Sequence, residues 1–165
     1  MNSSKLLIHY GSDYYDIAKF RPIKNRPEFG IKPSGGLWVS PLDSPLGWVD
    51  FCEKKEFDLQ SLSKCFVIKV RPTTKVYTID CYKDLASLPR ISGTYNIDFE
   101  AVAKKYNAIY LTFEGYNLTL HSTPMNLFGW DCECLLIMDK FCFTIEDQNY
   151  KRNDYEESKR DNFRY

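Results

Sequence analysis

The sequence predicts a single α+β domain built from several short strands and a few short helices. Short runs of β-branched and aromatic residues recur along the chain, separated by glycine, proline and polar turn residues. Residues 98–106 instead place apolar side chains at helical spacing. The 165 residues fit one domain and are enough to bury a hydrophobic core.

The first part of the chain is expected to hold two strands and a short helix around a long loop. The strands are residues 6–10 and 37–40, both short apolar runs beside glycines. Residues 13–34 mix aromatic, basic and turn-forming residues, which is typical of a functional loop, with a helical turn at 14–19. The helix is expected at residues 48–55.

The rest of the chain is expected to add one helix and four strands. The helix is amphipathic, covers residues 98–106 and begins at Asp98, whose side chain suits an N-cap. The first two strands flank the turn Arg71-Pro72-Thr73-Thr74. The strands are expected at residues 65–70, 75–79, 108–113 and 133–138.

Composition and charge narrow the class of protein. The 22 basic and 22 acidic residues balance, so no overall field favours nucleic acid or a membrane surface. No apolar run is long enough to span a bilayer, and the apolar segment at residues 6–8 is too short for a secretory signal. We therefore expect a cytoplasmic protein, with a domain at 1–145 and a polar C-terminal tail at 146–165.

The six cysteines are expected to be reduced, buried and apolar in behaviour. They lack the compact spacing of a secreted disulfide framework. Cys132 and Cys134 lie two apart on an expected strand and so face the same side. His9 and His121 are the only histidines, and no second close cysteine pair is present. The sequence therefore predicts no metal site.

The segment Gly35-Gly36-Leu37-Trp38-Val39-Ser40-Pro41 is the most informative motif. Two glycines allow a close backbone approach, and a short strand with a central tryptophan follows. A large aromatic side chain beside flexible backbone presents a flat face to a flat ligand. The motif therefore predicts a site for a ring-bearing ligand.

Two further segments complete a set of three. Leu7-Ile8-His9-Tyr10-Gly11-Ser12 lies upstream, and Trp130-Asp131-Cys132-Glu133 followed by an apolar run lies downstream. In this order the three segments resemble the motifs of the ADP-ribosyltransferase superfamily, in particular its diphtheria-toxin and poly-ADP-ribose-polymerase-like branch. In that branch a His with a following Gly and Thr or Ser ends a strand, a Gly-aliphatic-Tyr strand comes next, and a Glu starts a late apolar strand.

The resemblance implies a fold, a reaction and a substrate. The fold is an α+β domain with split antiparallel β-sheets and a few short helices. The reaction is mono-ADP-ribosyl transfer from NAD to an acceptor, with release of nicotinamide. Breaking the nicotinamide–ribose bond develops an oxocarbenium-like cation, which a nearby carboxylate stabilises. The resemblance gives this catalytic role to Glu133, places Asp131 near the acceptor nucleophile, and uses His9 to hold a ribose.

The resemblance also implies the residues that contact NAD. Trp38 stacks on the nicotinamide ring, and Trp48 or Phe51 closes the other side. Gly11 presents backbone groups to the nicotinamide amide. Tyr10 stands between the histidine and the glycine, so His9 and Tyr10 compete for the inward position. The residues expected to bind NAD are His9, Tyr10, Gly11, Ser12, Gly36, Trp38, Ser40 and Trp48.

Two hypotheses of function follow. The first is an NAD-dependent mono-ADP-ribosyltransferase that acts on a protein or nucleic-acid acceptor. The alternative is a non-catalytic module of the same fold that binds NAD, ADP-ribose or nucleic acid. A basic loop is expected beside the site. It either binds phosphate groups, of NAD or of a polynucleotide, or is a solvent-exposed loop. Its basic residues are Lys19, Arg21, Lys24, Arg26 and Lys32.

Overall fold

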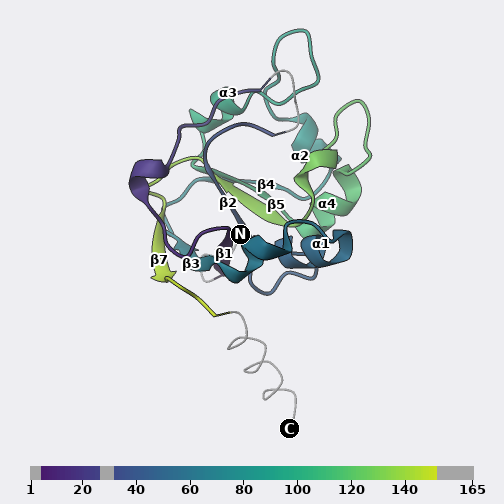
Figure 1. Cartoon of the computed structure of the whole chain (residues 1–165). Coiled ribbons are helices and arrows are strands. Elements are labelled where there is room, and N and C mark those ends of the chain that lie inside the picture. The colour runs from purple at the N-terminus through teal and green to yellow at the C-terminus, as the bar shows by residue number, and fades with distance from the viewer. Residues whose placement is uncertain (1–4, 27–31, 152–165) are drawn as a thin grey trace.

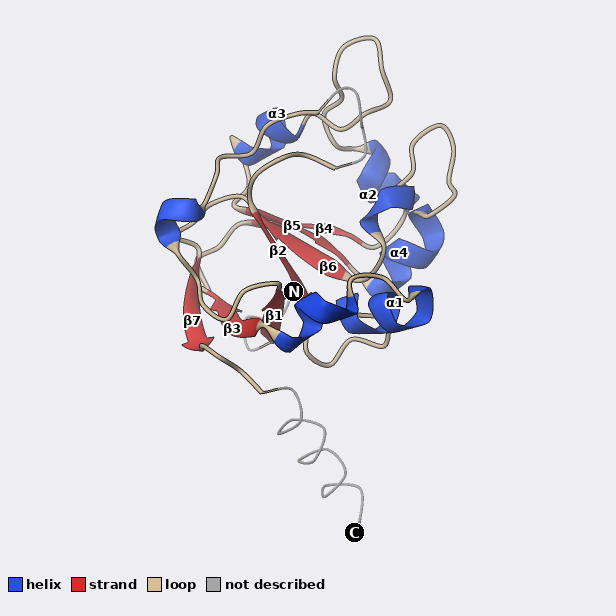
Figure 2. Ribbon diagram, viewed as in Figure 1, coloured by secondary structure: helices blue, strands red, loops and turns tan. Residues whose placement is uncertain are grey.

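A seven-stranded mixed β-sheet forms the centre of the molecule (Figures 1 and 2). The computed structural model describes residues 5–26 and 32–151. The strands are β1 (Leu6–Tyr10), β2 (Leu37–Pro41), β3 (Cys65–Val70), β4 (Val76–Ile79), β5 (Ala108–Leu111), β6 (Cys134–Ile137) and β7 (Phe143–Asp147). They lie side by side in the order β4-β5-β6-β2-β1-β3-β7.

Strand pairing differs from what the local turn pattern suggests. β4 and β5 are parallel, and the other neighbouring strands are antiparallel. β3 and β4 flank the turn at residues 71–74, but β3 pairs with β1 and β7, whereas β4 pairs with β5 at the far edge. The turn therefore directs the chain across the sheet instead of closing a hairpin.

The helices are short and mostly lie on one side of the sheet. α1 (Trp48–Lys55), α2 (Tyr82–Ala86) and α4 (Phe113–Thr119) gather at the side opposite β7, and α3 (Phe99–Ala103) lies apart from them (Figure 1). Asp98 caps α3, since its carboxylate accepts a hydrogen bond of 3.0 Å from the Ala101 amide. Short 3-10 helices cover residues 17–19, 59–63 and 128–130.

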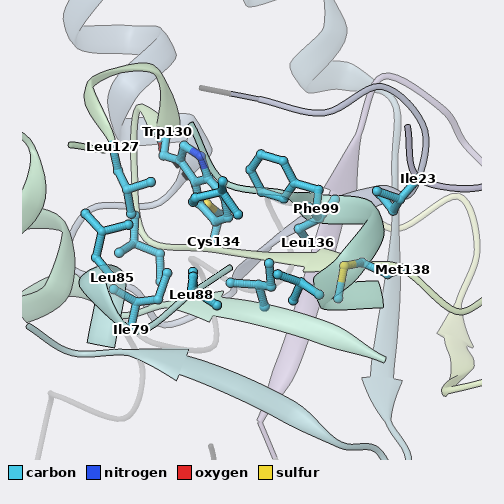
Figure 3. Packing of buried hydrophobic residues seen from close by; sticks show 14 of the residues in the cluster. Ile23, Ile79, Leu85, Leu88, Phe99, Leu127, Trp130, Cys134, Leu136 and Met138 are labelled. Atoms are coloured by element: carbon cyan, nitrogen blue, oxygen red, sulfur yellow. Dashed lines mark hydrogen bonds between the residues drawn. The ribbon is translucent and has the colours of Figure 1, made fainter. Parts of the chain in front are cut away.

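Apolar side chains cover both faces of the sheet. On one face Trp130, Phe99 and Leu85 pack over β5 and β6, as Figure 3 shows for Trp130, Phe99, Cys134 and Leu136. On the other face a second cluster joins β1, β3 and β7 to β5 and β6. β5 and β6 are buried on both faces, which explains why their sequences are continuous apolar runs without polar alternation.

β1 and β2 pair over only part of their length. Their ladder joins Leu7 to Pro41 and Ile8 to Ser40, and no further residue pair is made. β1 continues to pair with β3 as far as Tyr10, and β2 pairs with β6 from Leu37 to Val39. The two halves of the sheet therefore separate beyond Ile8, although strand order is continuous where split antiparallel sheets were expected.

The α+β class is confirmed, and most expected elements are present. β1, β3 and α1 have the expected bounds, and β2, β4, β5 and β6 differ by a few residues at their ends. The expected helix at 98–106 is shorter and ends at Ala103. α2, α4 and β7 were not expected. β7 crosses the expected boundary at residues 145–146, and most of the predicted tail lies outside the described residues.

Candidate functional site

A cavity of about 270 Å³ opens where β1 and β2 separate. Its walls come from the end of β1, from β2, from the start of α1 and from the segment before β6. All three predicted motifs therefore contribute to one site. Ligand cavities usually hold roughly 300 to 1,000 Å³, so this one suits a ring and its sugar better than a whole dinucleotide.

His9 bridges the two separated strands. Its Nδ1 lies 2.8 Å from the backbone carbonyl of Trp38, at the level where the ladder between β1 and β2 has stopped. A carbonyl only accepts hydrogen bonds, so Nδ1 carries the proton and Nε2 keeps its lone pair. Among the described residues, Nε2 has no hydrogen-bond partner. Nε2 is therefore an acceptor available to a ligand hydroxyl.

The His9 imidazole is held neutral. Burial lowers the pKa of His9 below its ordinary value, and the hydrogen bond to the Trp38 carbonyl opposes this only in part. The ring also packs on Phe66, with centroids 4.9 Å apart. Its orientation is therefore fixed by packing on one side and by a hydrogen bond on the other. Tyr10 lines the cavity as well, so the competition between His9 and Tyr10 ends with both present.

All three tryptophans of the sequence line the cavity. Trp38 meets the edge of Trp130 at a centroid distance of 4.8 Å, and Trp130 is almost fully buried. Trp48 stacks on Phe51 at a centroid distance of 5.4 Å, and Phe51 is not itself among the lining residues. The walls are therefore flat, rigid and aromatic, as a ring-bearing ligand requires.

Ser40 connects β2 to α1. Its hydroxyl accepts a hydrogen bond of 3.2 Å from the backbone amide of Trp48, the first residue of α1. The same oxygen lies 3.7 Å from the Cys132 sulfur. Ser40 is buried, so both contacts are shielded from water. It therefore lines the cavity and positions Trp48 there.

Asp131 and Lys32 form an ion pair inside the cavity. The Lys32 ammonium lies 2.5 Å from the Asp131 carboxylate and 5.5 Å from the centre of the Trp38 ring. Asp131 has φ +49° between Trp130 and Cys132, and the Cys132 amide donates to the Trp130 carbonyl across it. This is a γ-turn of the strained kind, with a non-glycine residue at its centre. The positive φ of Asp131 bends the backbone shortly before β6 begins at Cys134.

Glu133 is not among the residues that line the cavity. It is buried, and its carboxylate accepts hydrogen bonds from the hydroxyls of Tyr110 and, at 2.6 Å, Ser44. The Lys5 ammonium lies 3.5 Å away. Cys132 and Cys134 line the cavity, and alternation turns Glu133 to the opposite face, beside Tyr110. The role that the resemblance gives to Glu133 therefore lacks support from this geometry.

Gly35 and Gly36 allow the chain before β2 to pack closely against other backbone segments of the protein. Gly36 has φ +70°, and a Cβ there would lie 2.6 Å from the Ile137 carbonyl oxygen. At Gly35 a Cβ would lie 2.2 Å from the Pro22 carbonyl oxygen. Gly11 lines the cavity, but its amide donates to the carbonyl of Lys64 at 2.8 Å. Ser12 and Gly36 do not line the cavity.

Cys134 adds no reactive thiol to the cavity. Burial and the neighbouring Cys132 raise the pKa of Cys134 well above its ordinary value. Burial and Asp58 raise the pKa of the nearby Cys52 to about 11. These thiols stay protonated near neutral pH and are poor nucleophiles. Within residues 5–26 and 32–151, no three His, Cys, Asp or Glu residues are grouped as metal ligands.

Sequence reasoning did not single out several cavity residues. Lys32 belongs to the basic loop and Trp130 to the third motif, but neither was expected in the site. Asp58 and Ser61 reach the cavity from the segment after α1, where no motif marks them. Of the other basic loop residues, Lys24 pairs with Glu100 at 2.9 Å, outside the cavity.

Comparisons with known proteins add no assignment. No family model, curated protein sequence or solved structure matches the chain. In the described part of the chain, no helix has the length and apolar character that crossing a membrane demands.

Proposed function

We propose that the chain binds NAD in the cavity between β1 and β2 and is an NAD-dependent mono-ADP-ribosyltransferase. The observation that carries the proposal is the meeting of three tryptophans, a neutral histidine and a carboxylate in one cavity of about 270 Å³. A nicotinamide ring with its ribose matches this volume and these walls. Trp38 stacks on the ring, and Nε2 of His9 accepts a hydrogen bond from a ribose hydroxyl.

The proposal gives the catalytic role to Asp131 instead of Glu133. Asp131 lines the cavity, whereas the Glu133 carboxylate is taken up by Tyr110, Ser44 and Lys5. Asp58 also lines the cavity but is exposed to solvent, where a charge is screened. The side chain of Asp131 is about one quarter exposed, at 24%. A shielded carboxylate stabilises a developing ribose cation more strongly.

Nicotinamide release from NAD tests whether the chain is an enzyme. With water as acceptor, the wild-type chain should release nicotinamide above background, and Asp131→Asn should reduce the rate about 100-fold. Asp58→Asn, the matched control at the exposed carboxylate, and Glu133→Gln should retain the rate within a few-fold. Equal background rates in wild type and Asp131→Asn would refute the proposed catalysis.

The non-catalytic alternative rests on the ion pair of Asp131 with Lys32. A carboxylate that stays neutralised by an ammonium does not stabilise a second cation. If that pair persists in the complex, the chain binds NAD without turnover. Saturable NAD binding together with background nicotinamide release in every variant would establish this alternative.

A further inference from the structure

Lys32 occupies the place in the cavity that suits a cation. Its ammonium lies over the Trp38 ring and beside the Asp131 carboxylate. Among the described residues that line the cavity, Lys32 is the only lysine or arginine. The face of a tryptophan and a carboxylate together favour a positive charge. Lys32 is only partly buried, with its side chain 38% exposed, so it can leave toward solvent.

We propose that Lys32 is an internal stand-in for a cationic aromatic ring, and that the cavity selects ligands whose ring is a pyridinium. This inference rests on the proposed function, because the oxidised nicotinamide ring of NAD is such a cation. On binding, the pyridinium takes the contacts with Trp38 and Asp131, and the Lys32 ammonium moves out into water. A neutral ring of the same shape gains the stacking but leaves the Asp131 carboxylate without a partner.

The exchange of one cation for another defines the selectivity. Charge in the cavity is unchanged when a pyridinium replaces the ammonium, so Asp131 remains neutralised throughout. A neutral ring must either share the Trp38 face with Lys32 or leave a partly buried carboxylate unpaired, which is unfavourable. The same exchange prepares Asp131 for catalysis. Once Lys32 has left, the Asp131 carboxylate is free to stabilise the cation that develops on the ribose.

A pair of small probes isolates this exchange from phosphate binding. 1-Methylnicotinamide, methylated on the ring nitrogen, carries the pyridinium cation, and nicotinamide is its neutral counterpart; neither has a phosphate. All three tryptophans line the cavity, so intrinsic fluorescence follows binding of both probes. Lys32→Gln removes the competing ammonium and should tighten 1-methylnicotinamide binding at least about fivefold, and more than it tightens nicotinamide binding. Asp131→Asn should weaken the binding of 1-methylnicotinamide selectively.

Lys24→Gln is the matched control, since Lys24 also forms an ion pair, with Glu100, but away from the cavity. It should leave both affinities unchanged. Lys32→Met repeats the test with an apolar chain of similar length. If both Lys32 variants bind the cation no tighter than wild type, or if wild type prefers nicotinamide, the stand-in role is wrong, while NAD binding measured separately can still hold. Absence of NAD binding would instead refute the proposed function.

Discussion

Individual residues decide how the cavity is built, and Gly36 shows this at the start of β2. Its φ of +70° and its contact with the β6 backbone both exclude a side chain. Gly36→Ala should lower the free energy of unfolding by about 2–4 kcal/mol, because the new Cβ meets the Ile137 carbonyl. Urea unfolding measures the change.

Gly93 provides the control for Gly36. It has a similar φ of +76°, but a Cβ there meets nothing within 4 Å. Gly93→Ala should therefore cost only the backbone strain, about 1 kcal/mol. Equal losses at the two positions would show that close approach to β6 is not what requires glycine at position 36.

The lowered pKa of His9 makes the free energy of unfolding depend on pH, and it fixes the sign of that dependence. Burial lowers the folded pKa of His9 below the ordinary value of 6.5, so the unfolded chain binds a proton more readily. The contribution of neutral His9 to stability is complete above pH 6.5, and it is lost as the pH falls from 6.5 through the lowered folded pKa. Urea unfolding of the wild type should therefore show declining stability over this range, and His9→Gln should decline less steeply.

His121 is the matched control for His9, because it is the second of the two histidines and is exposed. His121→Gln makes the same chemical change at an exposed position. If His9→Gln and the wild type lose stability in parallel between pH 7 and pH 5, the neutral, buried state of His9 is incorrect.

Among the elements, β6 and its flanking segments are held together by Glu133. The carboxylate connects β5 through Tyr110, the loop before α1 through Ser44, and the chain before β1 through Lys5. Glu133→Gln should lower the free energy of unfolding by about 1–3 kcal/mol, because the amide keeps one acceptor and loses the charge that faces Lys5. Saturating NAD binding should be retained.

Tyr110→Phe separates these contributions. It removes one donor and leaves the Ser44 and Lys5 contacts in place, so its loss of stability should be smaller than that of Glu133→Gln. Loss of NAD affinity in Glu133→Gln without loss of stability would return Glu133 to the ligand site and contradict its role in holding these segments together.

Local sequence signals predicted single elements well and long-range arrangement poorly. The apolar run of β3 and the Asp98 cap are local features, and both occur as expected. Neighbours in the sheet depend on contacts between distant segments, so the turn after β3 did not reveal that β4 lies at the opposite edge. α2 has only five residues, too few for a clear periodic pattern.

The site could be predicted in outline for the same reason. Trp38, His9 and Asp131 stand in recognisable motifs, and the sheet brings them together. Glu133 carries the same chemistry as Asp131 and stands two residues away. Which of the two faces the cavity depends on the γ-turn at Asp131 and on strand alternation, which residue types alone do not specify.

At the scale of the whole molecule, the sheet is continuous in strand order yet separated at β1 and β2, and the cavity lies at this separation. The rigid β5 and β6 core supports one side of it, and α1 closes another. We therefore expect a ligand to bind with little change in the protein backbone, because the aromatic walls of the cavity are already packed.

Titration of intrinsic tryptophan fluorescence with NAD tests the central claim most directly. Because all three tryptophans line the cavity, binding there must change their emission. We expect a saturable change in the wild type that is abolished in Trp38→Ala and kept in Phe141→Ala, an exposed aromatic outside the cavity. A wild-type emission that does not respond to NAD, or an equal response in Trp38→Ala, would contradict the assignment of this cavity to NAD.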